Sequence, residues 1–100
     1  MTPRHVVRPA AEADIVDAAL WYEARATGLG ADFLRVVDVA LDEIRRKPER
    51  FPVVHMQCLR ALLRRFPYGI YFVATAELIS VVACMHARRD PHRWEERVGE

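Results

Sequence analysis

The sequence predicts an α+β fold in which an N-terminal strand precedes an α-helical hairpin packed on a small antiparallel sheet, with a short helix at the C-terminus. In the first half of the chain, apolar residues recur at spacings of three and four, which is typical of amphipathic helices. The second half contains short segments rich in branched and aromatic residues, separated by turn residues, which is typical of strands. One hundred residues suffice for one hydrophobic core, so we expect a single domain over 1–100.

The first two elements are a short strand at 5–8 and a helix over 10–26. Pro9 stands at the first helical turn, where a proline is tolerated because that position needs no N–H. The apolar side chains of this helix share one face: Ile15, Ala18, Ala19 and Tyr22. We expect Trp21 and Tyr22 to fill the seam between the hairpin and the sheet. The acidic residues near the start of the helix are expected on a solvated face: Glu12, Asp14 and Asp17.

A second helix is predicted from about Ala31 to Lys47. Gly28 and Gly30 interrupt the first helical pattern and join the two helices into an αα-hairpin. The apolar side chains again repeat at spacings of three and four: Leu34, Val37, Leu41 and Ile44. Basic residues occupy the last turn, where the negative end of the helix dipole favours them, and Pro48 ends the helix.

Three strands are expected next, over 59–66, 69–75 and 78–87. The links between them are too short for crossover connections, so these strands should be antiparallel neighbours. Asp90 is predicted to cap a final helical turn, with Pro91 at its first position. The predicted order of elements is therefore β-α-α-β-β-β-α.

The alternation of side chains along the last strand divides them between the two faces of the sheet. We expect one set to pack against the helical hairpin: Ile79, Val81, Ala83 and Met85. The other set should lie on the face that the hairpin leaves uncovered: Ser80, Val82, Cys84, His86 and Arg88. Arg60 and Arg64 also share one side of their strand, and Trp94 is expected over the sheet edge. This half-open face, with arginines and one histidine, is the predicted location of a site.

Charge is unevenly distributed along the chain. The net charge is +1, but the segment 59–93 contains six arginines against two acidic residues. Fourteen of the fifteen basic residues are arginine, whose planar guanidinium matches phosphate and carboxylate groups. These features predict an anionic partner for the second half of the chain.

Cys58 and Cys84 are the only cysteines, and they lie 26 positions apart without a CxxC pair or a His/Cys cluster. We therefore predict no metal site and no cofactor, and expect two buried, reduced thiols. No apolar run approaches the roughly 20 residues of a membrane span. The segment 1–8 lacks the apolar stretch of a signal peptide. Together these observations predict a cytoplasmic protein.

Several motifs, taken in order, resemble those of the RelE/ParE toxin superfamily. They are PAAEADI (9–15) leading into WYE (21–23), GLG (28–30) with FL (33–34), Pro48, FP (51–52), Arg60, RRFPY (64–68) with Ile70 and Phe72, and HARRDP (86–91) with Trp94. The similarity covers about residues 6–97, and it rests on the ordered set rather than on any single motif. It implies a helical hairpin on an antiparallel sheet, and a cognate antitoxin that wraps the toxin in a hetero-oligomer. It also implies growth inhibition and plasmid stabilisation.

The resemblance leaves the activity open between three alternatives. ParE-like members inhibit DNA gyrase without being nucleases, RelE-like members cleave mRNA on the ribosome, and a degenerate member would only bind its antitoxin. Cleavage of RNA needs a proton-transfer group and cations for the phosphate. The candidates for a nuclease site are His86, Arg60, Arg65 and Arg88, although strand alternation places Arg65 opposite Arg60. The candidates for antitoxin or target binding are Arg60, Arg64, Arg88 and Arg89, which suit an acidic antitoxin tail.

The end of the chain favours the ParE-like alternative. Members of the nuclease branch carry a tyrosine or a His-Tyr pair near the C-terminus, with lysines around the site. Here Ala87 follows His86, the last tyrosine is Tyr71, and no lysine follows Lys47. The Arg-Arg-Asp-Pro sequence at 88–91 is closer to ParE-like members. We therefore expect a non-enzymatic toxin.

Overall fold

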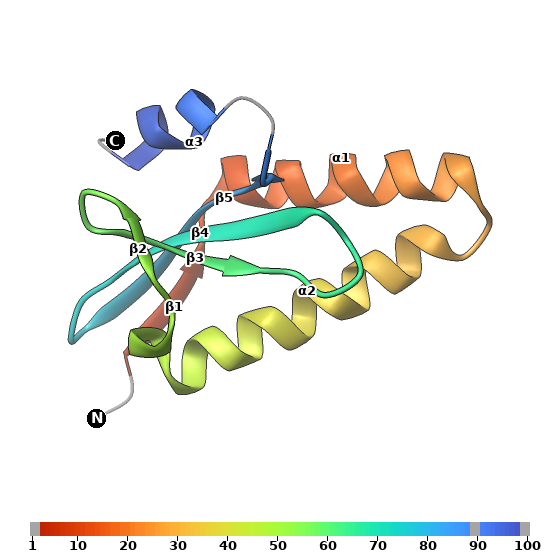
Figure 1. Ribbon diagram of the computed structural model, residues 1–100. Coiled ribbons are helices and arrows are strands. Elements are labelled where there is room, and N and C mark those ends of the chain that lie inside the picture. Colours follow the sequence, from red (N-terminus) through yellow and green to blue (C-terminus); the bar gives the residue numbers. More distant parts are fainter. Residues whose placement is uncertain (1–2, 89–90, 99–100) are drawn as a thin grey trace.

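The computed structural model describes residues 3–88 and 91–98 and confirms the predicted α+β class (Figure 1). The elements are β1 (Arg4–Val7), α1 (Pro9–Arg25), α2 (Leu29–Arg46), a 3-10 turn η1 (Pro48–Arg50), β2 (Val53–His55), β3 (Cys58–Leu62), β4 (Tyr68–Ala74), β5 (Leu78–His86) and α3 (Pro91–Val98). The five strands form one sheet in the order β1-β5-β4-β3-β2. Neighbouring strands are antiparallel, except that β1 runs parallel to β5.

The turn between α1 and α2 is very tight. Gly28 has a φ of 90°, a left-handed conformation that glycine adopts without a steric penalty. The Glu23 carboxylate accepts the backbone N–H groups of Gly28 and Gly30, each at 3.0 Å, and so satisfies free donors at the start of α2. A Cβ atom on Gly30 would lie 2.6 Å from the carbonyl oxygen of Ala19. The two helices therefore approach each other at a point where only glycine fits.

Two strand predictions need correction. β2 was not expected, because its three residues are too few to show a periodic pattern. The strand predicted over 59–66 is the shorter β3, which ends at Leu62. Arg65 has a φ of 70°, so the chain turns here instead of continuing as a strand.

β5 contains a β-bulge at Val82. Tyr71 of β4 is paired with Ala83, but the next residue of β4, Phe72, is paired with Val81. Val82 is therefore the extra residue on β5. An extra residue reverses the alternation of side chains along the rest of the strand.

The bulge corrects the predicted faces of the last strand. Ile79 and Val81, before the bulge, pack against the helical hairpin as expected. After the bulge Cys84 takes the hairpin side, whereas Ala83 and Met85 belong to the core on the opposite face. The prediction is therefore right for the first half of β5 and wrong for the second.

The sheet face away from the hairpin is not half-open, because α3 packs on it. Trp94 is 5% exposed and stacks on Tyr71, with ring centroids 4.4 Å apart and planes 15° from parallel. Val98 joins the same core. Trp94 thus covers the face of the sheet and not its edge. The predicted cap at Asp90 lies outside the described residues.

Candidate functional site

The structure disperses the arginines that were predicted to form one site. Arg60 is half-buried on the α3 side of the sheet, opposite Tyr71. Arg64 is exposed in the turn between β3 and β4, and Arg65 in the same turn lies 3.8 Å from Asp32 of α2. Arg88 is exposed just beyond β5. Arg89 lies outside the described residues.

His86 lies on the opposite face of the sheet from Arg60. It is paired with Tyr68 across β4 and β5, on the hairpin side, whereas Arg60 is paired with Tyr71 on the α3 side. A bulge could have brought the nuclease candidates together, but the bulge at Val82 moves His86 away from Arg60. The four candidates therefore do not converge on one point.

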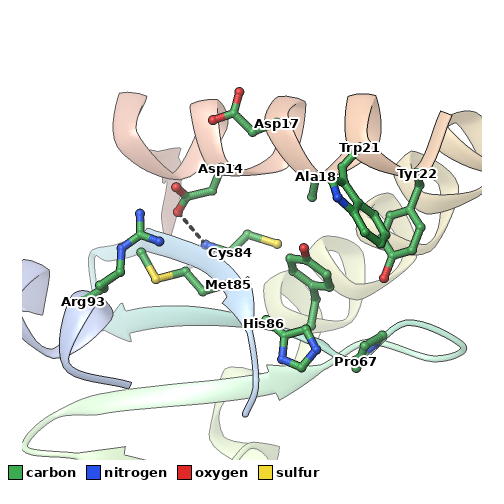
Figure 2. Close-up of a pocket in the computed structure, with 11 residues that line it drawn as sticks. Asp14, Asp17, Ala18, Trp21, Tyr22, Pro67, Cys84, Met85, His86 and Arg93 are labelled. Carbon is green, nitrogen blue, oxygen red and sulfur yellow. Dashed lines mark hydrogen bonds between the residues drawn. The ribbon is translucent and has the colours of Figure 1, made fainter. Parts of the chain in front are cut away.

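His86 instead lies in a groove between α1, the ends of β4 and β5, and α3 (Figure 2). The groove has a volume of about 510 Å³. Figure 2 shows Trp21 and Tyr22 projecting from α1 towards Pro67 and His86. The lining residues are Asp14, Asp17, Ala18, Trp21, Tyr22, Pro67, Tyr68, Cys84, Met85, His86 and Arg93. A smaller hollow continues from His86 to Arg88.

The His86 ring is held by its neighbours. Its centroid lies 5.6 Å from that of Tyr68, with the rings roughly edge to face. Its Nδ1 accepts the backbone N–H of Arg88 at 3.2 Å. Sequence reasoning missed Tyr68 as a neighbour of His86, although the antiparallel register of β4 and β5 could have suggested it.

One wall of the groove is fixed by Asp14, which corrects its expected place on a solvated face. Its carboxylate pairs with the Arg97 guanidinium through both oxygens and accepts the backbone N–H of Cys84 at 3.0 Å. Arg97 also donates to the carbonyl oxygen of Val82 at 3.3 Å. β1 pairs with β5 only as far as Val81, and beyond it these side chains bond two backbone groups of the β5 edge, the carbonyl of Val82 and the N–H of Cys84. The pair thereby ties α1, the bulge and α3 together.

On the other face, Arg60 lies beside the Tyr71 hydroxyl. Burial raises the pKa of Tyr71, and the nearby Arg60 guanidinium partly offsets this. Gly69 leaves room for both, because a Cβ there would lie 3.1 Å from the Arg60 stem and 3.3 Å from the Tyr71 hydroxyl. Arg60 is therefore part of the packing beneath α3.

Both thiols are buried, and burial raises the pKa of Cys58 to about 11 and that of Cys84 to about 12. Because the thiolate is the reactive form, the folded chain at pH 8 should react with dithionitrobenzoate at least about a hundredfold more slowly than the unfolded chain. The rate should rise as the pH approaches these pKa values. A thiol that reacts fast at pH 8 in the folded state would contradict this expectation.

Within residues 3–88 and 91–98, no helix combines the length and the apolar character needed to cross a bilayer. In the same described part of the chain, no group of three or more His, Cys, Asp or Glu side chains is placed to hold a metal ion.

No family model and no curated protein sequence matches the chain. Among solved structures, the chain is similar to one from a structure described as the chromosomal ParDE TA system from P. aeruginosa. The TM-score is 0.72 at 13% sequence identity, and the likeness covers 87% of this chain and 98% of the other. It shows a shared fold and confirms the fold that the resemblance to the RelE/ParE superfamily implied.

Proposed function

We propose that the chain is the toxin component of a type II toxin–antitoxin pair, a ParE-like growth inhibitor that its cognate antitoxin neutralises. The observation that carries the proposal is the fold shared with 98% of a chain from a ParDE system. The ordered motifs from 9–15 to 86–91 point the same way. DNA gyrase is the first target to test, because the Arg-Arg-Asp-Pro ending resembles that of ParE-like members.

A non-catalytic mode of action is supported by the separation of the candidate nuclease groups. General acid–base catalysis needs its groups within hydrogen-bond reach of one substrate. His86 faces the groove, Arg60 lies under α3, and Arg65 is beside Asp32. Binding to a target protein does not require these groups to converge.

Expression of the chain alone in a bacterial host, with mapping of mRNA 5′ ends as growth slows, tests the proposal. Growth arrest with intact messages is the expected result, and a gyrase supercoiling assay would then follow. New 5′ ends at in-frame positions of translated messages would overturn the non-catalytic mode. Unimpaired growth would instead favour a degenerate toxin that only binds its antitoxin.

The second candidate function, a RelE-like ribonuclease, is favoured by one observation. Tyr68 lies beside His86, and Arg88 follows in the adjoining hollow, so a His-Tyr pair exists in space although not in sequence. The pair would have to supply proton transfer, with Arg88 in the adjoining hollow as a cation for phosphate.

Replacing His86 by alanine separates the two candidates. We expect His86→Ala to arrest growth as the unmodified chain does, because the proposed toxin uses no proton transfer at this ring. Growth curves after induction measure the effect, and thermal melting of the purified variant verifies that it is folded. Loss of toxicity in a folded variant would favour the ribonuclease instead.

A further inference from the structure

The groove beside α1 is bordered by aromatic rings from two sides. Trp21 projects from α1 towards His86 at the end of β5 (Figure 2), and Tyr68 of β4 is paired with His86. Tyr22 and Tyr68 meet where α1 packs on the sheet, with ring centroids 6.0 Å apart. The volume of about 510 Å³ is typical of a small-ligand site, so the groove has room for a flat aromatic group such as a nucleobase.

Trp21 differs from Trp94 in its exposure. Trp94 is 5% exposed and stacked on Tyr71, whereas Trp21 lines the groove and is 48% exposed. The Arg25 guanidinium lies 4.2 Å from the centre of the Trp21 ring, so a cation stands beside an indole that is still open to solvent. Proteins that bind single-stranded nucleic acids use this combination, in which bases stack on exposed aromatic rings and arginines contact phosphates.

The charge around the groove favours an anionic ligand. Two carboxylates line it, and one of them, Asp14, is neutralised by Arg97. The other, Asp17, is exposed. Among the described residues, three exposed arginines border the groove and its adjoining hollow: Arg25, Arg88 and Arg93. Because these arginines outnumber the Asp17 carboxylate, the electrostatic potential at the groove is positive.

A nucleic acid strand matches this surface better than an acidic peptide does. The three arginines lie on different elements around the groove, in the last turn of α1, in α3 and just beyond β5. Phosphates recur along a strand and can meet cations on several sides, while a base occupies the space between them. Carboxylate side chains would satisfy the same arginines but would leave the exposed indole without a flat partner. A duplex would also leave it bare, because its bases are stacked inside.

We propose that this groove binds single-stranded nucleic acid, with one base stacked on Trp21 and phosphates at the three arginines. Binding involves no cleavage and no contact with Arg60, which lies on the other face of the sheet from His86. The proposal adds a nucleic acid contact to an inhibitor that otherwise needs only a protein target. That the strand is DNA, held by gyrase when the toxin binds, rests on the proposed function.

Binding of an oligothymidylate of about eight nucleotides to the whole purified chain tests the proposal. With a fluorescein label on the oligonucleotide, we expect saturable binding by fluorescence anisotropy. Raising potassium chloride from about 50 to about 200 mM should weaken binding about fifteenfold, because three phosphate contacts give a salt exponent of about −2 for a single strand. Absence of saturable binding in the lower salt would overturn the site.

Tryptophan emission reports the stacked base, because Trp94 is buried and Trp21 is open to the groove. Saturation with oligothymidylate should quench the emission of the unmodified chain, whereas a duplex of the same length should not. Trp21→Phe should lose the quenching but bind within about threefold, since it keeps a ring for stacking. Trp21→Ala should bind at least about fivefold more weakly. Quenching that persists in Trp21→Phe, or a Trp21→Ala variant that binds as tightly as the unmodified chain, would overturn the site.

Arg88→Ala tests the phosphate contacts. It should weaken binding at least about threefold in the lower salt and reduce the salt exponent by about 0.7. The matched control is Arg50→Ala, which removes the same charge from an exposed position in η1 and should keep the affinity within about twofold. Thermal melting verifies that each variant is folded. Equal losses for Arg88→Ala and Arg50→Ala would mean that net charge alone attracts the strand, and the site would fall.

An oligouridylate of the same length distinguishes the two sources of the strand. Uridylate that binds at least about tenfold more tightly than thymidylate would overturn the assignment to DNA and favour the ribonuclease. The growth assay separates the groove from the proposed function. Oligonucleotide binding without growth arrest would retain the groove and remove the toxin, and growth arrest without oligonucleotide binding would do the reverse.

Discussion

Replacing Asp14 by alanine is expected to lower the free energy of unfolding by about 3 kcal/mol and the melting temperature by about 15 °C. The Asp14 carboxylate accepts the N–H of Cys84 and pairs with Arg97, whose side chain is 19% exposed. Without the carboxylate, a nearly buried guanidinium loses its counter-ion and a backbone N–H at the bulge loses its acceptor. Two unsatisfied groups explain why the loss exceeds the roughly 0–1 kcal/mol of a surface ion pair.

The control is Asp17→Ala, which removes a carboxylate of the same kind from a position three residues further along α1. Asp17 is exposed, so its loss should change the free energy of unfolding by no more than about 0.5 kcal/mol. Combining Asp14→Ala with Arg97→Met removes both charges and should restore part of the loss, because no buried cation is left unpaired. Thermal and urea unfolding followed by circular dichroism measure all three. Equal melting temperatures for Asp14→Ala and Asp17→Ala would contradict the role assigned to the pair.

The hairpin was predictable because both helices show apolar residues at spacings of three and four, and because proline and glycine residues stand at their ends. α2 carries apolar residues on one side and charged residues on the other, and it ends at Arg46, two residues before Pro48. α1 begins at Pro9, as the proline predicts. α1 was also recognised from its buried face, but its apolar outer surface weakens the contrast between the two sides.

The bulge was not predictable from alternation. Residues 81–85 are all apolar, so neither face of β5 is marked by polarity, and a shift of one residue leaves no trace in the pattern. Asp14 was misplaced for a different reason. Its partner Arg97 is 83 positions away, and α1 gives no local sign of the contact. The surroundings of His86 depend on the bulge and on the Asp14–Arg97 pair. The residue types therefore indicated that a site exists, but they did not indicate which residues lie together in it.

Gly30→Ala is expected to destabilise the chain by about 2 kcal/mol, although alanine is the better helix former. Replacing glycine inside a helix normally stabilises by at most about 1 kcal/mol. Here the new Cβ would lie 2.6 Å from the carbonyl oxygen of Ala19 and 3.0 Å from the Cβ of Glu23. Neither atom can move without moving α1 as a whole.

Helix propensity predicts that Gly30→Ala raises the free energy of unfolding, whereas packing between the helices predicts that it lowers it. The sign of the measured change therefore shows which of the two effects is larger. Separation of α1 from α2 would also lengthen the bonds from the Glu23 carboxylate to the N–H groups of Gly28 and Gly30, so the loss should exceed a simple steric adjustment. Ala31→Gly, at the exposed neighbouring position, provides the control and should cost at most about 1 kcal/mol through propensity alone. Urea unfolding gives both values. A Gly30→Ala variant as stable as the unmodified chain would mean that α1 and α2 can separate at the turn without loss of stability. The close approach of Gly30 to Ala19 would then not be what fixes the angle between the two helices.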